Sequence, residues 1–118
     1  MGQIVAAAAY SKGRKVADFS LDEGKQWATR PEHFVWIGLR DPSSEELHSL
    51  QQQFNLHELA MEDAIAQHTR PKLETFGDAL FMMLYSPIRD EGRLQFIETQ
   101  LFAGKGYVIS ARYGNSAP

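Results

Sequence analysis

Carboxylates and imidazoles concentrate in the middle of this 118-residue chain, where no basic side chain balances them. Between Asp41 and Thr69 there is no Lys or Arg, so this stretch is strongly negative while the whole chain carries a net charge of -3. His57 and His68 lie in the same stretch. Such oxygen ligands suit a hard divalent cation, and the ordinary alternative is a solvated helical face. The acids concerned are Asp41, Glu45, Glu46, Glu58, Glu62 and Asp63.

Three of these acids fall within one short helical pattern. Glu58 and Glu62 are four residues apart and therefore share a helix face, and Asp63 stands beside them. A like-charge pair at this spacing costs a helix about 0.2–0.5 kcal/mol. Water or a cation must therefore make the arrangement tolerable. His57 could assist a softer metal such as zinc, although packing or a backbone hydrogen bond is the more common use of such a residue.

Other chemistry finds little support. The chain has no cysteine, which excludes disulfides, thiolate zinc sites and a cysteine nucleophile. His57 and Glu58 begin a zinc-protease motif, but Met61 takes the place of the second histidine. Gly104 and Gly106 lack the third glycine and the helix of a dinucleotide loop. We expect neither an enzyme nor an organic cofactor, and the pI of about 5.8 argues against nucleic-acid partners.

The acids are expected on two consecutive helices. Ser43 and Glu46 form a capping box after Pro42, and apolar residues then recur on one face, which predicts a helix from Ser43 to Phe54. Asn55 ends this helix, and a second helical pattern covers His57 to Gln67. The second helix has a narrow apolar side made of small residues.

The remaining chain reads as strands that pack beneath these helices. An N-terminal hairpin turns at Ser11 to Gly13, and the apolar run from Ala79 to Tyr85 has no polar alternation. We therefore predict an α/β fold in which a mixed, largely antiparallel sheet has a helix layer on each side (α/β/α). Phe34 and Trp36 are assigned to the core. The predicted strands are Gln3–Tyr10, Lys15–Phe19, Phe34–Leu39, Lys72–Phe76, Ala79–Ile88, Leu94–Phe102 and Gly106–Arg112.

Length and hydropathy predict one soluble domain that spans residues 1–118. The N-terminus has no basic residue before its apolar run, so it does not resemble a secretory signal. No apolar stretch approaches the ~20 residues that a membrane-spanning helix needs. Arg70, Pro71 and Lys72 are expected to fix the chain's path into the following strand, without a chemical role.

Three separate segments resemble one known family. They are W-I-G-L-R-D-P-S-S-E-E-L at 36–47, F-N-L-H-E-L-A-M-E-D-A at 54–64 and R-P-K-L-E at 70–74. In order and spacing they closely resemble the cytoplasmic domain of CorA magnesium transporters. The resemblance covers most of the chain from about Phe34 onward, and it continues through 80–85 and 100–110.

This resemblance implies the regulatory funnel domain of a homopentameric Mg²⁺ channel, at the cytoplasmic face of the cell membrane. The membrane spans and pore of that family lie outside this chain, and the transported ion could also be Co²⁺ or Ni²⁺. In the family, divalent cations between neighbouring domains hold the channel closed, and Glu62 and Asp63 match one half of that regulatory site. Two alternatives remain open, a zinc-transporting ZntB-like protein and a stand-alone soluble binding module.

Overall fold

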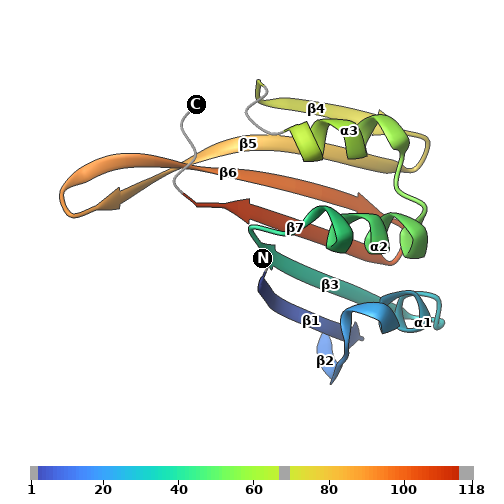
Figure 1. The fold of residues 1–118 in the computed structure, drawn as a ribbon. Helices are drawn as coiled ribbons and strands as arrows, with labels where there is room; N and C mark the ends of the chain where they lie inside the picture. The colour runs from blue at the N-terminus through green and yellow to red at the C-terminus, as the bar shows by residue number, and fades with distance from the viewer. Residues whose placement is uncertain (1–2, 67–69, 115–118) are drawn as a thin grey trace.

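In the part of the chain that the structure describes, seven strands form one mixed sheet in the order β2-β1-β3-β7-β6-β5-β4 (Figure 1). The computed structural model describes residues 3–66 and 70–114. Neighbouring strands are antiparallel except for the central pair β3 and β7, which is parallel. The predicted mixed, largely antiparallel sheet is therefore confirmed. The strands are β1 Gln3–Ser11, β2 Arg14–Asp18, β3 His33–Arg40, β4 Lys72–Phe76, β5 Ala79–Asp90, β6 Arg93–Gly104 and β7 Tyr107–Tyr113.

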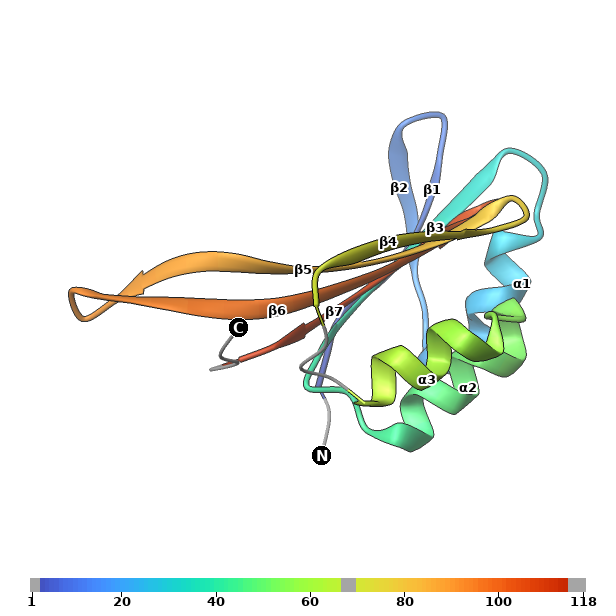
Figure 2. The same cartoon turned by 90° about the horizontal axis from the view of Figure 1, so that it is seen from above.

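The three α-helices found among these residues all lie on the same face of the sheet (Figure 2). They are α1 (Gly24–Ala28), which follows a short 3-10 turn and was not predicted, α2 (Ser44–Phe54) and α3 (Glu58–Ala66). Within residues 3–66 and 70–114 no helix covers the opposite face, so the expected helix layer on each side is not found there. None of these helices is long and apolar enough to cross a membrane.

Helix α2 forms for reasons that its own residues supply. Ser43 caps it, because its hydroxyl accepts a hydrogen bond from the Glu46 backbone N–H at 3.1 Å while the Glu46 carboxylate accepts one from the Ser43 N–H at 2.9 Å. Asn55 ends it in the left-handed conformation at φ 53°, which Asn tolerates better than most residues. Leu47 and Leu50, on the side facing the sheet, are buried.

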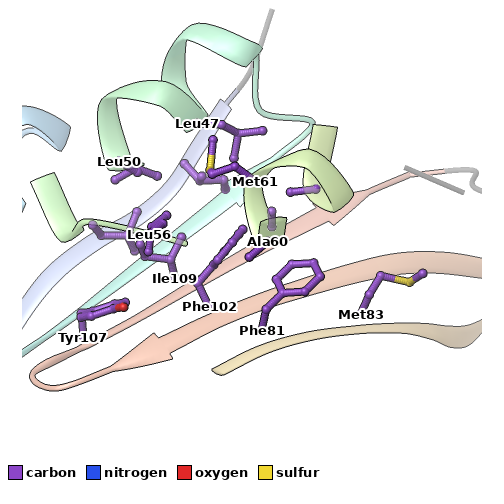
Figure 3. Packing of buried hydrophobic residues seen from close by; sticks show 14 of the residues in the cluster. Leu47, Leu50, Leu56, Ala60, Met61, Phe81, Met83, Phe102, Tyr107 and Ile109 are labelled. Atoms are coloured by element: carbon purple, nitrogen blue, oxygen red, sulfur yellow. The ribbon is translucent and has the colours of Figure 1, made fainter. Parts of the chain in front are cut away.

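The core lies between the helices and the sheet (Figure 3). Alternate residues of β5, β6 and β7 point toward the helices, because successive side chains of a strand face opposite sides. Phe81 and Phe102 pack with ring centroids 4.9 Å apart, and both are buried. Above them lie the buried residues of α2, of α3 and of the segment between them, which are Leu47, Leu50, Leu56, Ala60, Met61 and Ala64.

The open face of the sheet corrects the assignment of two aromatic residues. In β3, Val35, Ile37 and Leu39 point toward the helices, so the alternate residues Phe34 and Trp36 point away. These two residues are 40% and 37% exposed, which is more than the predicted core position allows. The unbroken apolar run in β5 divides in the same way. Phe81 and Met83 are buried under the helices, whereas their alternates are only half-buried.

Candidate functional site

Helix α3 carries the predicted cation ligands and buries only a small apolar surface. Ala60, Met61 and Ala64 face the sheet and are buried. Glu58 and Glu62 are exposed, as the i, i+4 spacing predicts. The helix therefore lies close to the sheet with its acids outward, at the edge of the molecule beside β4 and β5 (Figure 1).

Glu62 and Asp63 are neighbours along the chain but occupy different surroundings. Glu62 is exposed and forms no hydrogen bond or ion pair with a described residue. The Asp63 side chain is 27% exposed, and its Oδ2 lies 2.6 Å from the Lys72 Nζ. The structure thus brings the two predicted ligands onto one helix turn, where one is solvated and the other is paired within the chain.

Lys72 joins Asp63 to a second carboxylate. Its Nζ lies 2.7 Å from the Glu74 Oε1, so one ammonium group bridges two acids. Hydrogen bonds to Asp63 and Glu74 raise the pKa of Lys72 above its usual value. Lys72 and Glu74 share a face of β4 because they are two residues apart, and that face is the one nearer α3. The acidic stretch therefore receives its balancing charge from the strand that follows it.

His57 fixes the beginning of α3. Its ring stacks on Phe76 with centroids 4.0 Å apart, and its Nδ1 accepts a hydrogen bond from the Leu59 N–H at 3.1 Å. Packing and a backbone hydrogen bond are thus its roles, in line with the ordinary alternative to zinc binding. The other histidine singled out from this stretch, His68, lies outside the described residues.

The two ends of β4 hold the two ends of α3. Phe76, the last residue of β4, contacts His57 just before the helix, whereas Lys72, the first residue, contacts Asp63 in its second turn. The helix and the strand therefore run in opposite directions along one another. This arrangement places Asp63 against the sheet edge and leaves Glu62 facing outward.

A buried polar pair supports the last turn of α3 from below. Gln100 donates through its Nε2 to the Ala64 carbonyl at 3.1 Å and to the Glu98 carboxylate at 2.8 Å. Both side chains are fully buried in β6. Because Ala64 follows Asp63, this hydrogen bond fixes the height of the acid above the sheet. The pKa of Tyr113 is raised above its usual value, mainly because Tyr113 is buried and in addition because of the charge of Glu98.

The sequence interpretation missed Lys72, Glu98 and Gln100. Lys72 was assigned only to the chain's path into β4, although it is the first Lys after the acidic stretch. A signal for the other two exists in the period of a strand. Phe102 is buried, so Gln100 and Glu98, two and four residues before it, must point to the same buried face.

The donor chemistry at α3 is of a kind that a hard divalent cation accepts. Carboxylate oxygens are ligands that Mg²⁺ accepts, and the Lys72 ammonium shows that Asp63 attracts a cation where it stands. Among the described residues, no three acidic or imidazole side chains converge closely enough to hold a metal ion. Glu62 and Asp63 would therefore need further ligands from elsewhere.

Comparison with known protein families identifies the family of this chain. The family described as CorA-like Mg²⁺ transporter protein matches residues 31–118. The chain belongs to the CorA-like Mg²⁺ transporter family. That match includes α2, α3 and β3 to β7, and it confirms the resemblance seen in the three sequence segments. No curated protein sequence matches the chain.

Solved structures with the same fold include members of this family. The chain aligns with the complete CorA magnesium transporter of Methanocaldococcus jannaschii at a TM-score of 0.62 and 15% identity, covering 96% of this chain and 33% of that one. With the soluble domain of the same CorA it aligns at a TM-score of 0.60 and 16% identity, covering 95% of this chain and 42% of that one. With the full-length CmaX protein it aligns at a TM-score of 0.67 and 21% identity, covering 93% of this chain and 35% of that one. The chain thus has the fold of a CorA soluble domain and spans about a third of the length of the full-length structures.

Proposed function

We propose that this CorA-like chain is the cytoplasmic regulatory domain of a divalent-cation transporter, and that it senses Mg²⁺ through Glu62 and Asp63 on α3. In this proposal the ion lies between neighbouring identical subunits of a pentamer, and its binding favours the closed state. The observation that carries the proposal is the placement of two adjacent carboxylates at an outer edge of the molecule, in a chain of this family.

Charge explains how such a site could couple ion binding to assembly. Two subunits that each present acids at a shared surface repel one another, because charges interact strongly where water is partly excluded. A Mg²⁺ ion between them neutralises the acids and bridges them directly or through its bound waters. When the ion leaves, the repulsion returns. The closed state is favoured only as far as the ion binds it better than the open one.

The surroundings of the imidazoles support Mg²⁺ over the zinc alternative. Zinc sites use imidazole or thiolate ligands, and this chain has no cysteine. His57 is stacked on Phe76, while His33 and His48 each pair through Nδ1 with a nearby backbone carbonyl oxygen, at 2.8 and 2.7 Å. None of these three rings forms its stacking contact or hydrogen bond with Asp63, Lys72 or Glu74. Transport of Co²⁺ or Ni²⁺ by the full-length protein remains compatible with the oxygen ligands.

Mg²⁺ inhibition of ion currents in the full-length protein tests this proposal. We expect internal Mg²⁺ to close the native channel and to leave the E62A/D63A variant conducting. D22A/D78A is the matched control, because it removes two exposed acids that lie outside α2 and α3 and should behave like the native protein. Equal inhibition of the native protein and E62A/D63A would rule out sensing at these residues.

A further inference from the structure

The ammonium group of Lys72 lies directly against Asp63, one of the two proposed cation ligands. Its Nζ lies 2.6 Å from the Asp63 Oδ2 and 2.7 Å from the Glu74 Oε1. Among the described residues, no other Lys or Arg forms an ion pair with an acid of α3. Lys72 is half-buried with its side chain 29% exposed, so the group is held against the sheet edge rather than freely solvated.

We propose that Lys72 is an internal counter-ion that a divalent cation must displace from Asp63. This inference rests on the proposed function, since it concerns the same site. In the absence of the ion, Lys72 neutralises Asp63; when the ion binds, the ammonium gives up that contact. Lys72 thereby sets the Mg²⁺ concentration at which the site fills.

Electrostatics makes the two occupants competitors. An ammonium and a divalent cation on the same carboxylate would lie a few ångströms apart and would repel one another, with the repulsion reduced by the water that reaches this partly exposed site. Mg²⁺ also requires near-octahedral geometry with its own waters, which leaves no room for a lysine on the oxygen that it uses. Each occupant therefore weakens the binding of the other at Asp63.

Glu74 can keep its ion pair with the ammonium group of Lys72 after that group has left Asp63. The Lys72 Nζ already bonds to Glu74, and the flexible four-carbon stem allows the group to move toward Glu74 without unfolding β4. The displacement therefore costs one of two ion pairs rather than both. This favours a modest adjustment of affinity over a block of the site.

The test measures the Mg²⁺ concentration that gives half of the maximal thermal stabilisation of the full-length protein. We expect K72Q to lower that concentration about two- to fivefold, because ion pairs at partly exposed surface positions contribute in this range. K72R keeps both the charge and the bonding, so it should need at least as much Mg²⁺ as the native protein. K105Q removes the same charge from the exposed turn between β6 and β7, and it should leave the value unchanged.

The outcomes separate this inference from the proposed function. If E62A/D63A removes the Mg²⁺ stabilisation and K72Q leaves the half-maximal concentration unchanged, sensing at α3 stands and competition by Lys72 is wrong. A Mg²⁺ response that persists in E62A/D63A overturns both. An equal decrease in K72Q and K105Q would attribute the effect to overall charge and overturn the competition alone.

Discussion

Helices α2 and α3 follow one another along the chain and lie on the same face of the sheet, yet different residues hold them in place. Helix α2 has its own capping box, a left-handed Asn55 at its end and buried leucines. Helix α3 has a like-charge pair on its surface and relies on β4 and β6 through Asp63, His57 and the Ala64 carbonyl. The helix that is locally self-sufficient provides structure, and the helix that needs support carries the candidate site.

The largest expected effect is on the packing of α2. Leu50 is fully buried, so L50A should destabilise the fold by about 2–5 kcal/mol through lost burial and a residual cavity. Urea denaturation measures the change. The folded fraction should keep its native response to Mg²⁺, because Leu50 is not part of the α3 surface. A loss of that response in fully folded L50A would contradict the division between the two helices.

Support of α3 by β6 should be the next largest effect. Q100L keeps a similar volume but removes both hydrogen bonds, which leaves the Ala64 carbonyl and Glu98 with fewer partners at a cost of about 1–3 kcal/mol. Hydrogen exchange should accelerate in α3 more than in α2. Equal acceleration in both helices would show that Gln100 supports the whole core rather than α3.

The cap of α2 should contribute less. S43A removes the acceptor for the Glu46 N–H and should cost about 1 kcal/mol, with faster hydrogen exchange in the first turn of α2 and no change in α3. S44A is the control, because Ser44 is the adjacent exposed hydroxyl and lies inside the helix. Similar losses in S43A and S44A would mean that the capping hydrogen bond contributes nothing.

The smallest effect should have the opposite sign. E62Q removes the repulsion between Glu58 and Glu62, so it should stabilise α3 by about 0.2–0.5 kcal/mol in the absence of divalent cations. E45Q in the first turn of α2 should instead be neutral or slightly destabilising, because an acid there interacts favourably with the helix N-terminus. Thermal unfolding in EDTA distinguishes the two. Destabilisation by E62Q would contradict the idea that this acid is kept at a cost to stability.

Most of the fold could be predicted from the sequence because its signals are local. The capping box, the break at Asn55 and the turns at Gly13 and Gly92 each depend on residues close together in the chain. The N-terminal hairpin, α2, α3 and the four C-terminal strands are confirmed as predicted elements. Helix α1 could not be predicted from the sequence, because its five residues are too few to show a helical period.

The one-sided placement of the helices could not be predicted in the same way. The apolar run of β5 predicts a helix layer on both faces of the sheet, but Leu80 and Met82 are only half-buried on the open face. Strand periodicity separates the two faces of a strand without telling which one a helix will cover. Trp36 lies on the face that no described helix covers, and there its Nε1 donates a hydrogen bond to the Ser110 Oγ at 3.2 Å.

The candidate site was predicted only in part, since its ligands come from a local motif and its partners from a distant contact. Glu62 and Asp63 follow from the sequence segment that the chain shares with its family. The Asp63 to Lys72 ion pair depends on β4 lying alongside α3, which no local pattern encodes. Because of that contact, Glu62 is solvated whereas Asp63 is paired within the chain.

Diffraction from crystals of the full-length protein grown with Co²⁺ tests the central claim most directly. The anomalous signal of the metal locates it without reference to transport. The account predicts a peak within coordination distance of the Glu62 or Asp63 carboxylates, shared with a neighbouring subunit, and its disappearance in E62A/D63A. Peaks confined to other parts of the protein, with both acids free of metal, would contradict it.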